Sequence, residues 1–318
     1  MNTLTLHSRL PTVWENPPRP QRIGLALAGG AARGMAHVGV LQALDAHNIP
    51  IHAIAGTSAG ALVGGLYAAG VSGQRLLDVR RGLKWTSISS IGLKSLSLSR
   101  LSLSNVGLPL GLLDLDKLIE WIHGVLGGPV EFSQLNIPFA AVASDIVRGE
   151  AVVMNEGDIA LAIRASSTVP GVFTPVRRNG RLLVDGVVVN NLPISVVREM
   201  GADYIIAVEL VPPAGQRDRE PANALEMMMM STYAMIRATQ HEFMPPDCLI
   251  EPAIGHISMM DMGKSDELVE LGRVAAEALI PQIKRDLGLA DQPPAVLDGN
   301  VLEDNVLEGE MVDLSTSA

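Results

Sequence analysis

The chain of 318 residues is poor in the features that mark secreted or membrane-spanning proteins. Cys248 is its single cysteine, so no disulfide can form within the chain, and we expect a reducing, cytoplasmic setting. No uncharged apolar run approaches the roughly 18 residues of a membrane span, and residues 1–22 lack the apolar core of a secretory signal. We therefore expect at most peripheral contact with the inner membrane surface.

Binding residues for two kinds of ligand are also missing. Nothing in the distribution of Lys and Arg indicates a nucleic-acid surface, which needs basic residues clustered on one face. No spacing of His, Asp and Glu forms a convincing metal site, and no motif implies an organic cofactor. We therefore expect a protein that works without nucleic acid, metal or cofactor.

The C-terminal stretch supplies most of the net charge of the chain, which is −10. From Asp291 onward there are seven acidic residues and no Lys or Arg. A five-residue repeat in this stretch matches neither helical nor strand spacing: Val296-Leu297-Asp298, Val301-Leu302-Glu303 and Val306-Leu307-Glu308. We predict a disordered acidic tail over residues 289–318, with a segment that binds an unidentified protein partner as the alternative.

Between the two ends, apolar strands alternate with helical patterns. Residues 1–21 contain four prolines and are predicted to form an irregular arm. A buried strand over residues 23–28, a glycine-rich turn and a helix to about residue 48 then lead into a second strand at residues 51–54. This order indicates an α/β fold with three layers, α/β/α, and a mainly parallel central sheet, over residues 22–288.

The alternation breaks between residues 80 and 113. This stretch is rich in Ser and Leu and carries five basic residues before the first acid, Asp114. A long segment without periodicity inside a compact domain is often a lid or a binding loop. We consider two interpretations of residues 80–113, a flap that meets anionic lipid over the site and an ordinary insertion packed on the domain.

The most informative motif is G-x-S-x-G, which lies between the second strand and a helix of small residues. In this context it is typical of a nucleophile elbow, where glycines allow strand and helix to approach closely and the serine hydroxyl is exposed. Ser58 is the candidate nucleophile, and the elbow is completed by Gly56, Thr57, Ala59 and Gly60. The alternative is that Ser58 is merely a small residue in a tight turn.

A serine hydroxyl needs a base that takes its proton, and attack on an ester needs donors for the oxyanion. Asp185 is the candidate base, since it ends a strand predicted from the hairpin signal Asn179-Gly180 and is followed by Gly186 and Val187. The glycine-rich turn offers N–H groups at a helix N-terminus as an oxyanion hole, from Gly29, Gly30, Ala31, Ala32, Arg33 and Gly34. Arg33 adds positive charge there, whereas His37 on the following helix is interpreted as packing.

Four motifs in order, G-G-x-x-R-G, G-T-S-A-G, A-S-S-x-x-P-G-x-F-x-P and D-G, resemble the patatin-like phospholipase family, in particular its bacterial members related to neuropathy target esterase. The resemblance spans residues 22–210 and implies a three-layer α/β/α fold. It also implies a Ser–Asp dyad without histidine, made here by Ser58 and Asp185, with an oxyanion hole at Gly29 to Arg33.

The sequence departs from the family's pattern at two positions. Ala31 stands where the family often has a third glycine, and it keeps a usable N–H group if its φ is negative, whereas a positive φ would distort the oxyanion hole. Val187 stands where the family favours Gly or Ala, and it narrows the space beside the base. Neither change removes a catalytic atom.

Three other functions are each compatible with part of the sequence. A dinucleotide site is set aside, because the second strand leads into the elbow rather than to an acidic residue for the ribose. An α/β-hydrolase with a Ser–Asp–His triad would use His241 or His256, and a non-catalytic adaptor would use the fold without turnover. We predict a serine hydrolase that cleaves carboxylic esters of phospholipids or lysophospholipids through an acyl-enzyme on Ser58, with the pKa of Asp185 raised by burial.

Overall fold

The computed structural model describes residues 22–80, 85–91, 110–212, 220–222, 224–239 and 245–289. The predicted arm, nearly all of the predicted acidic tail and most of the candidate lid lie outside the described residues. From the lid region the structure shows α4 (Trp85–Ile88) and a short antiparallel pair, β3 (Ser90–Ile91) with β4 (Leu113–Asp114). The domain limits and the lid therefore stay predictions.

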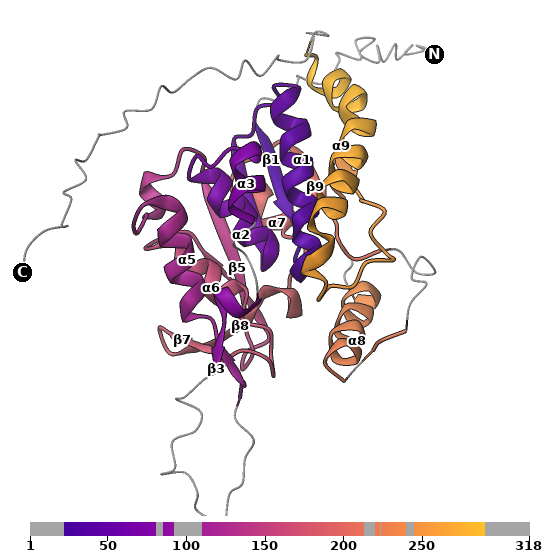
Figure 1. The fold of residues 1–318 in the computed structure, drawn as a ribbon. Coiled ribbons are helices and arrows are strands. Elements are labelled where there is room, and N and C mark those ends of the chain that lie inside the picture. The colour runs from indigo at the N-terminus through magenta and orange to yellow at the C-terminus, as the bar shows by residue number, and fades with distance from the viewer. Residues whose placement is uncertain are drawn as a thin grey trace, which may run out of the picture.

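A mixed sheet forms the centre of the molecule (Figure 1). Its strands lie in the order β10 (Cys248–Ile250), β9 (Tyr204–Val208), β1 (Ile23–Leu27), β2 (Ala53–Thr57), β5 (Phe139–Asp145), β8 (Arg181–Asp185) and β7 (Val176–Arg178). Pairing is parallel from β10 to β5 and antiparallel from β5 through β8 to β7, and β6 (Glu150–Met154) also pairs antiparallel with β5. The predicted α/β fold with a mainly parallel sheet is confirmed.

Helices connect the strands and cover the sheet. They are α1 (Met35–Ala46), α2 (Ala59–Ala68), α3 (Gly73–Val79), α5 (Asp116–Leu126), α6 (Ile159–Ser166), α7 (Ile194–Glu199), α8 (Ala224–Thr239) and α9 (Ser265–Leu287). Single 3-10 turns precede α1 and follow β8, namely η1 (Ala31–Gly34) and η6 (Gly186–Val188). No helix in the described part of the chain is long and apolar enough to span a bilayer.

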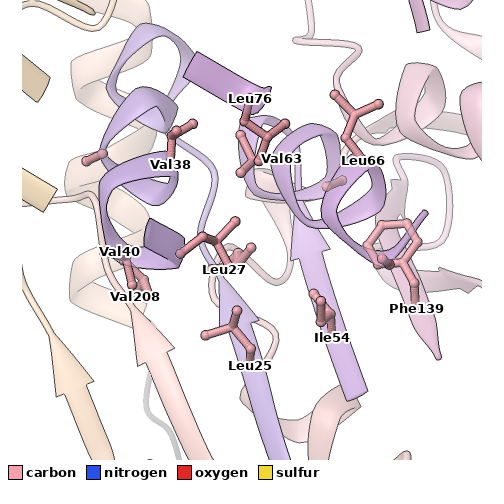
Figure 2. Close-up of a cluster of buried hydrophobic side chains, with 14 of the residues drawn as sticks. Leu25, Leu27, Val38, Val40, Ile54, Val63, Leu66, Leu76, Phe139 and Val208 are labelled. Carbon is pink, nitrogen blue, oxygen red and sulfur yellow. The ribbon is translucent and has the colours of Figure 1, made fainter. Parts of the chain in front are cut away.

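The two faces of the sheet carry side chains of different size, because alternate residues of a strand point to opposite faces. Leu25 and Leu27 of β1 belong to the larger core, with Ile54 and the helices α1 and α2 (Figure 2). Ala26 and Ala28 face the other way, into a core of mostly small residues that α7 covers. Helices on both faces complete the three layers.

One strand ends earlier than its apolar pattern predicts. The sequence predicts a strand over residues 204–210, whereas β9 stops at Val208. The carboxylate of Glu209 accepts hydrogen bonds from the N–H groups of Leu210 and Val211, each at 2.8 Å. Because those N–H groups turn toward a side chain, they are not available to a neighbouring strand.

The sheet register brings together two positions that are far apart in sequence. Thr57 at the end of β2 pairs with Val142, and Asp185 at the end of β8 pairs with the next residue of β5, Ala143. The residue after Thr57 therefore lies almost level with Asp185, with only β5 between their strands.

Candidate active site

Ser58 stands at a sharp turn between β2 and α2, with φ 53° and ψ −118°. A positive φ is uncommon for a residue with a side chain, and such strain concentrates at functional sites. Close packing holds the turn in place, because a Cβ atom at Gly60 would clash with the carbonyl oxygen of Leu27. Local geometry of this kind is that of a nucleophile elbow.

The hydroxyl of Ser58 donates a hydrogen bond to Oδ2 of Asp185, at 2.7 Å. Both side chains are buried, and Asp185 is only 1% exposed. Burial raises the pKa of Asp185 to about 7, while the Val187 N–H group, 3.0 Å from Oδ1, and the Ser58 hydroxyl oppose that rise. A carboxyl group with this pKa can both accept and return a proton near neutral pH.

Ser166 fixes the backbone of the elbow from the far side. Its Oγ accepts a hydrogen bond from the N–H of Ser58, at 2.8 Å, and donates one to the carbonyl of Val142, at 2.6 Å. The sequence places Ser166 in the A-S-S-x-x-P-G-x-F-x-P motif but does not show what its hydroxyl group contacts. The double serine at the end of α6 was the available signal, but its partners became visible only once α6 lay beside β2 and β5.

Some backbone N–H groups of the glycine-rich turn donate hydrogen bonds within the protein, and others have no acceptor among the described residues. The N–H of Gly29 donates to Asn191, both to Oδ1 at 3.1 Å and to the carbonyl oxygen at 3.3 Å. The N–H of Ala32 donates to the carbonyl of Met259, at 2.9 Å, and that of Arg33 to Gly30, at 3.1 Å. Within the described ranges, the N–H groups of Gly30 and Ala31 meet no acceptor, which leaves them available to an oxyanion.

Ala31 has a positive φ of 50°. The turn thus keeps a left-handed conformation that glycine adopts freely, and the methyl group of alanine makes this conformation less favourable by roughly 1–2 kcal/mol. That methyl group also lines the cavity beside Ser58. A positive φ is the case for which the sequence predicts a distorted oxyanion hole. The N–H of Ala31 nevertheless meets no acceptor among the described residues, so the turn keeps an available donor at the cost of backbone strain.

The side chains of Arg33 and His37 hydrogen bond to backbone carbonyl groups and not to Ser58 or Asp185. The buried guanidinium of Arg33 donates to the carbonyls of Ile257, at 2.6 and 2.9 Å, and of Gly255, at 3.2 Å. His37 is fully buried, with Nε2 2.8 Å from the carbonyl oxygen of Ala28, and burial lowers its pKa to about 4. His37 is therefore neutral at physiological pH and donates to the strand that leads into the turn.

A histidine-containing triad has no support in the described part of the chain. His256 is exposed and pairs with Glu267, at 2.9 Å. His241 lies outside the described residues. No described histidine hydrogen bonds to Ser58 or Asp185, and no described cluster of His, Cys, Asp or Glu is placed to hold a metal.

Ser58 opens into an apolar cavity with a volume of about 80 Å³. Its walls come from η1, α1, α2, α4 and α5 and from the loop that follows α6. Its hydrophobic lining includes Met35, Leu62, Leu115, Leu118, Val169 and Phe173. In the sequence these positions could not be distinguished from ordinary core positions, because an apolar residue lining a hollow has the same pattern as one packed against a neighbour.

Comparisons with known proteins identify the family of this chain. A family model described as patatin-like phospholipase matches residues 25–198. The uncharacterized NTE family protein Rv1063c of Mycobacterium tuberculosis is 40% identical over 221 residues, covering 67% of this chain and 57% of that protein. Lysophospholipase NTE1 of Meyerozyma guilliermondii is 27% identical over 330 aligned positions, covering 93% of this chain and 21% of that protein. The chain thus spans little more than half of the first relative and about a fifth of the second.

Among solved structures, the crystal structure of VipD from Legionella pneumophila has a similar fold, with a TM-score of 0.52 and 16% identity over 85% of this chain and 67% of that one. The family model covers more than half of the chain and includes η1, the elbow, Ser166 and Asp185. The chain belongs to the patatin-like phospholipase family.

Proposed function

We propose that the chain is a serine hydrolase that cleaves carboxylic esters of lipids with Ser58 as nucleophile and Asp185 as base. The observation that carries the proposal is the 2.7 Å hydrogen bond from the Ser58 hydroxyl to a carboxyl group that is itself buried. Family membership supports the same reaction class. A serine without a base nearby would be a poor nucleophile.

In the first half-reaction, Ser58 Oγ attacks the carbonyl carbon of the ester and its proton passes to Asp185 Oδ2. The N–H groups of Gly30 and Ala31 stabilise the resulting oxyanion, since they point out of a preorganised turn and need no reorganisation. Asp185 then returns the proton to the leaving alcohol oxygen as the carbon–oxygen bond breaks. The acyl group remains on Ser58.

In the second half-reaction, Asp185 takes a proton from a water molecule that attacks the acyl carbon. The tetrahedral intermediate collapses, Ser58 regains a proton from Asp185, and the fatty acid leaves. The same carboxyl group acts as base and then as acid in each half, and a pKa near 7 suits both roles at neutral pH.

The apolar cavity supports a substrate with a hydrocarbon chain. Its walls offer hydrophobic contacts to an acyl group and few polar contacts to a headgroup. A relative named as a lysophospholipase supports the same class. We therefore propose phospholipids or lysophospholipids as substrates, met at the cytoplasmic surface of a membrane.

The test compares wild type with Ser58→Ala, Asp185→Asn and His256→Gln on p-nitrophenyl esters and on lysophosphatidylcholine, together with labelling by a fluorophosphonate probe. We expect the first two substitutions to abolish turnover, by at least about a thousandfold for the nucleophile, and His256→Gln to leave it intact. For wild type, kcat/KM should rise with pH through about 7, because the base must be ionised.

Labelling separates the remaining outcomes. If the probe labels Ser58 but no ester is cleaved, the dyad stands and the proposed substrates are wrong. If wild type is neither labelled nor active on any acyl ester, the non-catalytic adaptor function replaces the hydrolase.

A further inference from the structure

Helix α8 has an apolar face toward the active site and a second apolar face toward solvent. On its inner face Met229 and Tyr233 are buried against Val187 of η6 and Met259, in a small cluster next to Ala31. On its outer face Met227 is 54% exposed and Met228 is 41% exposed. A helix that is hydrophobic all round belongs in an apolar environment rather than in water.

Polar groups on the outer face of α8 are already satisfied within the helix. The hydroxyl of Ser231 donates to the carbonyl of Met227, at 2.9 Å, and that of Thr232 to the carbonyl of Met228, at 3.0 Å. Glu226, the one charged residue between positions 226 and 235, is buried and accepts hydrogen bonds from Ser258 and from the Ala222 N–H. This stretch could therefore leave water without stranding a charge or a hydroxyl group.

The exposed methionines lie beside the entrance to the catalytic cavity. Sδ of Met228 is 3.7 Å from the position that a Cβ atom would take at Gly171. Gly171 belongs to the loop after α6, whose residues Val169 and Phe173 line the cavity together with Ser58. On the other side of the same loop, the N–H of Leu112 donates to the carbonyl of Val172, at 3.0 Å, and the Leu112 side chain is 62% exposed.

Exposed apolar side chains thus flank the cavity loop on both sides, from α8 and from the segment before β4, and both elements lie at the lower end of the molecule in Figure 1. Contiguous exposed apolar surface marks a contact site. Because this surface adjoins the loop that lines an apolar cavity, and α8 has no charged residue from Met227 to Met235, a lipid surface fits it better than a polar protein partner.

We propose that the outer face of α8 and Leu112 form the surface by which this protein docks onto a lipid layer, with the cavity entrance between them. The existence of this surface does not depend on the proposed function. Only its role as the entrance for a lipid substrate rests on the proposed function. Attachment is by apolar side chains, so it is insensitive to salt, in contrast to attachment by basic residues.

The test measures flotation with phosphatidylcholine vesicles, using Ser58→Ala as the background so that the lipid is not consumed. Met227→Gln/Met228→Gln and, separately, Leu112→Gln should each weaken vesicle binding, the double variant by about tenfold or more. Val274→Gln is the matched control, since Val274 is 51% exposed on α9, away from the cavity. Binding should be equal in low and high salt.

Turnover of a short, soluble p-nitrophenyl ester, measured without the Ser58 substitution, should be unchanged in the methionine variant, while turnover of vesicle lipid falls. Equal vesicle binding by the Ser58→Ala parent and both variants would overturn the proposal, as would a parent that does not float with vesicles. The proposal would also be overturned if the double methionine variant changed only the oligomeric state, from dimer to monomer, and not vesicle binding. Because flotation does not need Ser58, failure of the hydrolase proposal would appear separately, as absent turnover with intact binding.

Discussion

Asp185, the proposed base, lowers the stability of the folded protein when it is ionised. Its carboxyl group is only 1% exposed, and it must carry a negative charge to act as a base. Burial raises its folded-state pKa to about 7, above the ordinary value of 3.8. The folded protein therefore holds the proton to higher pH than the unfolded chain does. Its contribution to stability is complete below about pH 4 and is lost as the pH rises through 7.

The substitution Asp185→Asn should therefore raise the free energy of unfolding while it removes turnover. The pKa change corresponds to on the order of 4 kcal/mol at pH 8 and considerably less at pH 5. Thermal unfolding of wild type and variant at both pH values checks this. Asp78→Asn, at an exposed position on α3, is the control, and an equal gain in Tm at both pH values would contradict the assignment.

Ala31 offers a second test at the residue scale. Glycine adopts its φ of 50° without strain, so Ala31→Gly should stabilise the protein by about 0.5–1 kcal/mol, despite the loss of a methyl group. The neighbouring change Ala32→Gly should do the opposite, because Ala32 is buried and has a negative φ. Urea unfolding of both variants measures the difference, and destabilisation by Ala31→Gly would show that its methyl contacts outweigh the strain.

The sequence was sufficient to single out Ser58 and Asp185, because the elbow and the hairpin are local patterns with strict glycine requirements. Asn191 and Ser166 were missed, since each acts on a residue more than 100 positions away: Gly29 in one case and Ser58 in the other. Such partners depend on the sheet order, which no local pattern fixes. The roles proposed for Ser58 and Asp185 stay predictions until turnover is measured.

At the scale of elements, α1 and α9 form the most extensive helix pair in the molecule (Figure 1). Their backbones touch at two glycines, where a Cβ atom at Gly39 would clash with the carbonyl of Val269 and one at Gly272 with the carbonyl of Ala36. Each helix thus provides a glycine that the backbone of the other helix packs against. Apolar residues at helical spacing predict both helices, one up to about residue 48 and one over residues 266–287. They do not predict that the two helices pack together, because small residues give no signal of what they face.

The substitution Gly272→Val should accordingly force α9 away from α1 and destabilise the protein by about 3 kcal/mol or more. Val274→Gly, two residues further on an exposed face, should cost only about 0.5 kcal/mol through helix propensity, because valine is itself a weak helix former. Denaturant unfolding of the two variants checks the ranking. If the two variants were equally stable, the close approach of the helices would not contribute to stability as inferred.

At the scale of the whole molecule, the charge is unevenly divided. The net charge of −10 includes seven acidic residues from Asp291 onward, which leaves −3 for the rest, since −10 + 7 = −3. The last helix ends at Leu287, with Gly288 in a left-handed conformation as its cap. The candidate site and the described residues therefore lie before the acidic stretch.

Removal of residues 290–318 should leave the Tm and the turnover of a soluble ester unchanged while it shifts the isoelectric point upward. Thermal unfolding, ester hydrolysis and isoelectric focusing of the shortened chain test the predicted domain limit. A further deletion into α9, ending before Ile280, serves as the control that must unfold, because Ile280 and Ile283 are buried. Loss of activity in the first deletion would place a needed segment beyond residue 289.

The antiparallel pairing of β8 with β5 also has a consequence for the chain during its synthesis. Ser58 and Asp185 are 127 positions apart, and they meet only after β5 has joined β2 and β8 has folded back on β5. A ribosome-bound chain that has released only the first half of the sheet therefore carries a serine with no base. Under the proposed mechanism, hydrolysis requires the completed sheet, so turnover of an ester would report that the sheet has finished folding.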